Sequence, residues 1–208
     1  MSNINNLKNI MFDLGGVLFP LSISATTDAY ERNGAKDAAE TFEKKLCDET
    51  DIAYRYTTGT CTSAEYRAFC NNVFNTNMDD ETFDNCWNAM ILCYPDENRI
   101  LLQKLKDSGY NLYVLSNINE IHVNYVEKLA QWPEGLFVKR YYSNEIHFSK
   151  PFENCFQYVI NDSGMNPAET IYIDDRDDNI ATAKKLGFNT IHLTDPYSLT
   201  EQLNIYIK

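Results

Sequence analysis

Short apolar runs alternate with amphipathic segments over most of the chain. Five runs rich in apolar and aromatic residues are too short for helices and predict buried strands, over residues 9–12, 111–115, 140–143, 170–173 and 190–193. Between them, apolar residues recur at helical spacing, as in 120–130 and from Pro151 at a first helical position to Gly164. This alternation predicts parallel strands joined by right-handed helical crossovers. The expected fold class is α/β, a doubly wound parallel sheet of Rossmann-like type.

Residues 18–94 have a different pattern: apolar residues recur at helical spacing, aromatic residues are frequent, and no obvious strand is present. Thr62 and Glu65 have the spacing of a capping box, in which each side chain binds a free N–H group at a helix start. We therefore predict a core made of residues 1–17 and 95–208, with a small helical bundle inserted after the first strand.

Composition and charge exclude some classes of binding partner. The 208 residues carry a net charge of −12, and basic residues form no local patch, so we expect binding to neither nucleic acid nor an anionic membrane. No apolar window is long enough for a membrane span, and the first ten residues lack the apolar stretch of a signal peptide. We expect a cytoplasmic protein, as a monomer or weak homodimer. The six cysteines form no CxxC pair and are expected to be free thiols.

Polar side chains follow three of the predicted strands, and a lysine precedes a predicted helix at the same edge. These candidate site residues are Asp13, Ser116, Asn117, Lys150, Asp174 and Asp175. Open parallel sheets bind ligands at the carboxyl ends of their strands, so these groups are expected to converge. Each alone has an ordinary structural explanation, as a turn cap, a helix cap or a surface charge. Together they predict a site.

The residue types suit phosphoryl transfer. Asp13 can attack phosphorus and form an aspartyl-phosphate. Mg²⁺ prefers oxygen ligands, which Asp13 and Asp175 offer, with Asp174 as a further ligand or an orienting group. Lys150 can pair with a phosphate oxygen and restrain the nucleophile, while Ser116 and the Asn117 N–H can donate to another phosphate oxygen.

The four motifs, in this order, resemble the haloacid dehalogenase superfamily. The resembling segments are Phe12-Asp13-Leu14-Gly15-Gly16-Val17, Val114-Leu115-Ser116-Asn117, Ser149-Lys150-Pro151 and Ile173-Asp174-Asp175 with Asn179. The resemblance implies a Rossmann-like core, magnesium, a small phosphorylated metabolite, and a helical cap at 18–94. Within the superfamily the chain looks most like the α-D-glucose-1-phosphate phosphatase group, which implies a sugar phosphate.

One position departs from the pattern of many phosphatases in this superfamily. They carry a second Asp two residues after the nucleophile as general acid and base, whereas this chain has Gly15. The Gly15 carbonyl can still bind magnesium, but it cannot transfer a proton, and such catalysis contributes about 10²–10⁴-fold. The substrate then needs a better leaving group, such as an anomeric hydroxyl, or a cap residue or water supplies the proton, or the enzyme is weak.

Two rival functions remain. A metal-independent 2-haloacid dehalogenase uses the same nucleophile on carbon, but it leaves the pair Asp174 and Asp175 without a purpose. A degenerate, non-catalytic ligand-binding member is supported by Gly15 alone. In the cap, the segment 54–60 is a candidate closing loop with Arg55 as its substrate-contacting residue, and the alternative is a simple surface turn. The aromatic residues Tyr66, Phe83 and Trp87 are expected in the core of the cap.

Overall fold

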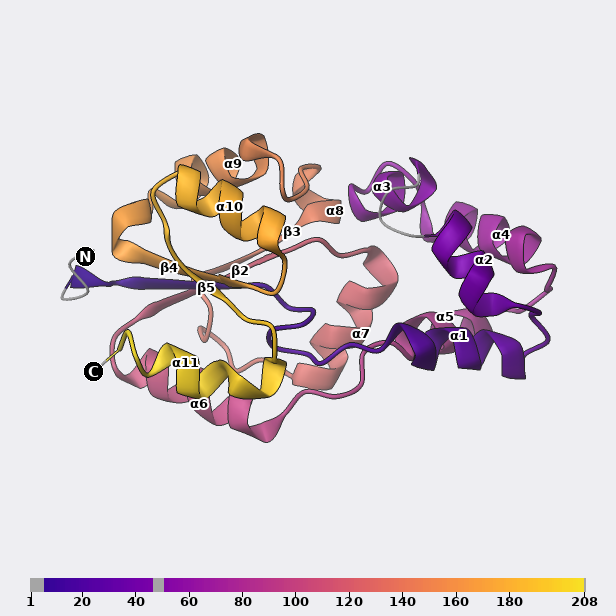
Figure 1. Ribbon diagram of the computed structural model, residues 1–208, viewed down its shortest axis with the longest axis horizontal. Helices are drawn as coiled ribbons and strands as arrows, with labels where there is room; N and C mark the ends of the chain where they lie inside the picture. Colours follow the sequence, from indigo (N-terminus) through magenta and orange to yellow (C-terminus); the bar gives the residue numbers. More distant parts are fainter. Residues whose placement is uncertain (1–5, 47–50, 208) are drawn as a thin grey trace.

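The computed structural model describes residues 6–46 and 51–207, and at its centre lies a parallel sheet (Figure 1). Its strands are β1 (Asn9–Phe12), β2 (Asn111–Ser116), β3 (Lys139–Tyr142), β4 (Thr170–Asp174) and β5 (Asn189–His192). The order is β3-β2-β1-β4-β5, and every neighbouring pair is parallel. β1 is therefore central, and the chain winds to one side of it through β2 and to the other through β4. The predicted doubly wound α/β fold is confirmed.

Helices cover both faces of this sheet (Figure 1). One face carries α6 (Asp96–Asp107), α7 (Glu120–Ala130) and α11 (Leu199–Leu203), and the other carries α9 (Glu153–Ser163) and α10 (Asp177–Lys185). The short elements α8 (Ser143–Ile146), η2 (Pro167–Glu169) and η3 (Pro196–Ser198) lie in the connections. Successive strand residues point to opposite faces, so Ile171 and Ile173 join the first layer and Tyr172 joins the second.

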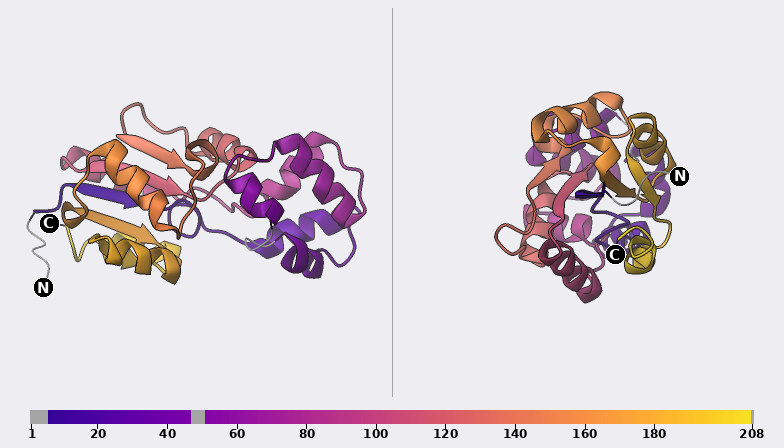
Figure 2. Two further views of the ribbon diagram at one scale, coloured as in Figure 1. Left: turned by 90° about the horizontal axis from the view of Figure 1, so that it is seen from above. Right: turned by 90° about the vertical axis from the view of Figure 1, so that its left-hand side faces the viewer.

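The inserted helices extend from one end of the sheet (Figure 2) and have their own apolar core. They are α1 (Ile23–Arg32), α2 (Ala38–Lys45), α3 (Asp51–Thr57), α4 (Ser63–Phe74) and α5 (Asp80–Asn88). The predicted capping box of Thr62 and Glu65 is present at the start of α4. Tyr66, Phe83 and Trp87 are buried in this core, as predicted.

Two antiparallel linkers join the cap to the sheet. Leu21 pairs with Ile91 in a bridge, and Leu92 N–H donates to the Pro20 carbonyl at 3.1 Å. The proposed boundaries at 17/18 and 94/95 stay a prediction. By side-chain packing, four residues placed in the cap lie instead in the apolar cluster of the sheet, namely Leu18, Phe19, Ile91 and Tyr94.

Two local expectations need correction. Pro151 does not open a helix: α9 begins at Glu153, and Phe152 between them is 56% exposed. The reason is that Asn117 binds both the N–H and the C=O of Lys150, at 2.9 and 2.8 Å, and holds this segment as a loop. The segment 54–60 is also not a free loop, because α3 continues to Thr57.

The turn after α3 packs on α8 of the core (Figure 1). Ser143 Oγ donates to the Thr57 carbonyl at 2.6 Å, and the His147 ring nitrogen Nδ1 lies 2.8 Å from the Thr58 carbonyl. Gly59 has φ +70°, and a Cβ there would lie 2.1 Å from the Asn144 carbonyl oxygen. Only glycine fits this contact without moving the cap.

The described cysteines are free. Four are buried and Cys93 is exposed, which agrees with the expectation of free thiols, while Cys47 lies outside the described residues. Over the described part of the chain, every helix is too short or too polar to cross a membrane.

We predict that Gly59→Ala weakens the seating of the cap. Left-handed backbone costs a non-glycine residue about 1–2 kcal/mol, and the clash with Asn144 adds to this cost. We expect chemical denaturation to show a decrease of more than about 3 kcal/mol in the free energy of unfolding. We expect small-angle scattering to show a larger radius of gyration.

Gly34→Ala is the matched control, because Gly34 lies in the cap with φ +97° and a Cβ there would meet nothing within 4 Å. Gly34→Ala should lower the free energy of unfolding only by the cost of left-handed backbone at alanine. Equal losses in the two variants would show that the contact with Asn144 does not position the cap.

Candidate active site

The carboxyl ends of β1, β2 and β4 bring the predicted polar residues to one edge of the sheet. Phe12 pairs with Val114 on one side and with Ile173 on the other, so the residues that follow these strands are close neighbours. Lys150 joins them from the loop before α9, where its side chain is almost fully buried. The structure thus brings together segments that are far apart in the sequence.

Lys150 is the central cation of this edge. Its Nζ lies 2.9 Å from Asp13 Oδ2 and 2.7 Å from Asp174 Oδ2. Burial disfavours the charge of Lys150, but the two carboxylates outweigh this and raise the pKa of the lysine. The ammonium therefore stays charged and holds the two acids a fixed distance apart.

Asp174 is saturated by protein donors. Oδ2 accepts from Lys150 and from the Tyr172 hydroxyl, while Oδ1 accepts from Arg176 N–H and Asn179 Nδ2, both at 2.9 Å. Burial alone would raise the pKa of Asp174, but Lys150 and these hydrogen bonds hold it below its usual value. All the favourable acceptor positions are in use, so Asp174 is arranged to orient Lys150.

Asp13 is held less completely. Its Oδ1 accepts from Leu14 N–H at 2.6 Å, and its Oδ2 accepts from Lys150. Burial raises the pKa of Asp13 to about 7; Lys150 opposes this rise, and the charges of Asp174 and Asp175 add to it. A cation beside Asp13 would favour the ionised form.

Asp175 completes a group that can hold a metal. One ligand atom from each of Asp13, Asp174 and Asp175 lies within 4.8 Å of the others, and in the described ranges no second group of this kind is found. Asp175 is half-buried, and a Cβ on Gly16 would lie 2.4 Å from its Oδ2. An all-oxygen donor set suits Mg²⁺. Because Asp174 is saturated, Asp13 and Asp175 fit direct ligation best.

The remaining candidates, Ser116, Asn117 and Gly15, lie outside the group of three carboxylates and Lys150. Ser116 is buried at the end of β2, and the Asn117 side chain aligns Lys150 through two hydrogen bonds to its backbone. Their contacts to phosphate, and that of the Gly15 carbonyl to a metal, stay predictions.

The ion pair of Arg55 lies within the cap, and its contact with a substrate stays a prediction. Arg55 points along the cap to Asp51, at 3.8 Å, and its side chain is 44% exposed. From the same segment, Thr57 and Thr58 contact the core instead.

Sequence patterns missed several residues around the site. Ser143 Oγ accepts from Ile118 N–H at 2.9 Å and so joins the loop after β2 to the cap. Ser63 of the cap donates to Glu120 at the start of α7. Tyr172, two residues before Asp174 on β4, could have been found from strand alternation, which puts both side chains on one face.

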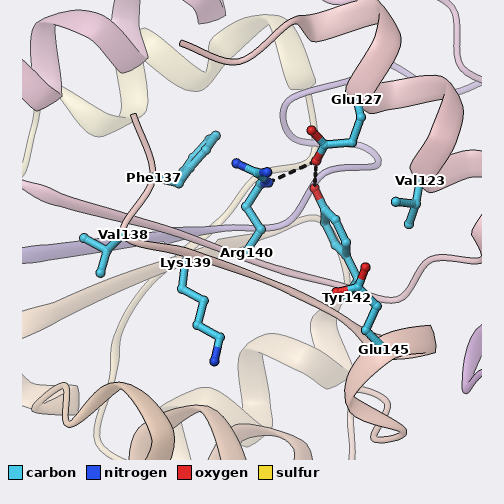
Figure 3. A pocket seen from close by; sticks show the side chains of 8 residues that line it. All are labelled: Val123, Glu127, Phe137, Val138, Lys139, Arg140, Tyr142 and Glu145. Atoms are coloured by element: carbon cyan, nitrogen blue, oxygen red, sulfur yellow. Dashed lines mark hydrogen bonds and ion pairs between the residues drawn. The ribbon is translucent and has the colours of Figure 1, made fainter. Parts of the chain in front are cut away.

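A cavity of about 350 Å³ lies elsewhere, beside the edge strand β3 (Figure 3). Two of its charged groups pair with each other: Glu127 lies 3.0 Å from Arg140 Nε, and it also accepts from the Tyr142 hydroxyl. None of the predicted site residues lines it.

Comparison with known proteins bears on this geometry. The family model of haloacid dehalogenase-like hydrolases matches residues 10–193. D-ribitol-5-phosphate phosphatase of Bacteroides thetaiotaomicron is 26% identical over 97% of this chain and 98% of its own. (S)-2-haloacid dehalogenase 4A of Burkholderia cepacia is 27% identical over 48% of this chain and 42% of its own.

Solved structures agree with the fold. A HAD family enzyme of Bacteroides thetaiotaomicron superposes with a TM-score of 0.85 at 30% identity, over 94% of this chain and 98% of that one. A structure of that enzyme in complex with magnesium and inorganic phosphate gives 0.81 at 32% identity, over 89% and 93%.

We predict that Asp13 makes the metal-free protein less stable as the pH rises. The folded protein binds the Asp13 proton more tightly than the unfolded chain does, so this contribution to stability is lost between about pH 4 and about pH 7. In chelator, the free energy of unfolding of the wild type should fall by roughly 2 kcal/mol more than that of Asp13→Asn between pH 5 and pH 8. Urea denaturation at both pH values measures this difference, and parallel pH curves for the two proteins would contradict it.

Proposed function

Because the chain belongs to the haloacid dehalogenase-like hydrolases, we propose that it is a magnesium-dependent phosphatase that uses Asp13 as a covalent nucleophile. The observation that carries the proposal is the buried Lys150 bridging Asp13 and Asp174, with Asp175 close enough to share a metal with Asp13. The related enzyme solved with magnesium and inorganic phosphate supports the same chemistry.

The first step forms a bond between an Asp13 carboxylate oxygen and phosphorus and breaks the bond to the leaving oxygen. A carboxylate and a phosphate repel each other, so positive charge must lie beside both. Lys150 supplies a fixed charge, and its third N–H can donate to a phosphate oxygen. Mg²⁺ held by Asp13 and Asp175 would neutralise further negative charge.

The second step returns Asp13 to its starting state. Water attacks the phosphorus of the aspartyl-phosphate, the Asp13–phosphorus bond breaks, and inorganic phosphate leaves. Asp174 takes no part in bond making; its four donors keep it in place to hold Lys150 during both steps.

The substrate we propose is a small sugar or polyol phosphate. The name of the relative, D-ribitol-5-phosphate phosphatase, supports a phosphorylated polyol, while the Gly15 position favours a sugar 1-phosphate with its better leaving group. The cap contacts the core through the turn that packs on α8, where Ser143 and His147 contact the Thr57 and Thr58 carbonyls. A panel containing ribitol 5-phosphate and glucose 1-phosphate distinguishes these substrates.

We predict that phosphate release needs both Asp13 and a divalent cation. Asp13→Asn should remove turnover, and chelator should abolish it until Mg²⁺ is restored, because nucleophile and charge neutralisation are then lost. Asp175→Asn should raise the Mg²⁺ concentration that gives half-maximal rate by at least about tenfold. A phosphate-release assay measures all three.

Asp107→Asn is the control, since Asp107 is exposed at the end of α6. Turnover of a 2-haloacid in chelator would instead support the dehalogenase, and Asp13-independent phosphate release would contradict the mechanism.

A further prediction concerns the leaving group. Gly15 offers no proton donor, and a Cβ there would lie 2.8 Å from Leu21 Cδ1, so a cap linker residue fills this space. The rate should therefore fall steeply as the pKa of the leaving alcohol rises, across a series of aryl and alkyl phosphates.

The double variant Gly15→Asp/Leu21→Ala makes room for a carboxyl group and should flatten this dependence, with Leu21→Ala alone as its control. A flat dependence in wild type would mean that another group already donates the proton.

A further inference from the structure

Tyr172 joins the charged network of the site through a single hydrogen bond. Its side chain is fully buried, and its hydroxyl donates to Asp174 Oδ2, the same oxygen that accepts from Lys150 Nζ at 2.7 Å. Tyr172 and Asp174 are two residues apart on β4, so both side chains lie on the face covered by α9 and α10. One carboxylate oxygen is thus shared between a phenol and an ammonium.

The ring of Tyr172 is held from two sides. Phe156 lies edge-on to it, with ring centroids 5.3 Å apart and planes at 89°, and the centroid of Phe188 is 6.4 Å away. Lys150 Nζ lies 5.7 Å from the Tyr172 centroid. Burial and the negative charge of Asp174 raise the pKa of Tyr172 well above its usual range, so the hydroxyl remains a donor. Packing therefore fixes where this donor points.

The shared oxygen controls where the ammonium lies. Asp174 Oδ1 already has two donors, so Tyr172 and Lys150 share the charge of Oδ2 alone. Without the hydroxyl, Lys150 would be the one donor left on Oδ2, and the attraction would draw Nζ toward Asp174. Its contact with Asp13 Oδ2, now 2.9 Å, would lengthen.

We propose that Tyr172 is a positioning residue, whose hydroxyl shares Asp174 Oδ2 with Lys150 and so keeps the ammonium between Asp13 and Asp174, within reach of a phosphate oxygen. The inference rests on the proposed phosphatase function. Tyr172 acts through Asp174 and Lys150 and touches no reacting atom.

The test compares Tyr172→Phe with Tyr30→Phe. Tyr30 is equally buried in the cap, and its hydroxyl has no hydrogen-bond partner among the described residues, so this control removes the same atom without breaking a described hydrogen bond. Tyr172→Phe should lower kcat about tenfold and weaken inorganic phosphate binding, measured by calorimetry with Mg²⁺ present, by a similar factor. Its half-saturating Mg²⁺ concentration should not change, because Asp13 and Asp175 are intact. Tyr30→Phe should change none of these.

Phosphate affinity and kcat within twofold of wild type would overturn the proposal. A parallel loss of phosphate affinity, Mg²⁺ affinity and melting temperature would also overturn it, since that is the mark of a structural role. If Tyr172→Phe does not fold, Phe156→Leu, which loosens the ring but keeps the hydroxyl, should weaken phosphate binding without changing the Mg²⁺ requirement. Phosphate binding does not depend on turnover, so failure of the phosphatase function and failure of this inference give different results.

Discussion

A buried ammonium between two buried carboxylates is the constraint on which the site depends. Removing Lys150 would leave Asp13 and Asp174 facing each other in a region with little water, and such unpaired buried charges cost several kcal/mol. The surrounding structure serves to keep this cation in place: Asn117 binds the backbone of Lys150, and Asp174 binds its side chain. Stability and chemistry are thus tied to the same group.

The parallel sheet makes this arrangement possible at low cost. Asp13 directly follows the central strand β1, and Asp174 is the last residue of its neighbour β4, so the pairing of Phe12 with Ile173 brings the two acids next to each other. Burial raises the pKa of Asp13 to about 7, and the negative charges of Asp174 and Asp175 add to this rise against the opposing charge of Lys150. A divalent cation at Asp13 and Asp175 would supply the missing charge, which is a physical reason for metal dependence independent of any family resemblance.

The sequence allowed the strands and their polar ends to be predicted because both follow from short-range patterns. The bounds of β1 were predicted without error, and Asp13, Asp174 and Asp175 were placed at one edge by the rule for parallel sheets. The contact of Arg55 with Asp51 was not predicted, because spacing does not show which face of α3 meets the core, and its role toward a substrate stays a prediction. The part that Asn117 takes in holding Lys150 was also missed, since it joins two loops 33 residues apart. Such contacts depend on tertiary packing.

The cap is connected to the same two loops that carry the phosphate-binding candidates. Ser143 bonds both Ile118, just after Ser116 and Asn117, and the cap turn at Thr57. Lys150 lies seven positions after Ser143, so the segment that contacts the cap leads directly to the central cation. A change in the position of the cap would therefore act on the loop after β2 and on the segment that leads to Lys150. The position of the cap and the placement of charge in the core are thus joined through the hydrogen bonds of Ser143.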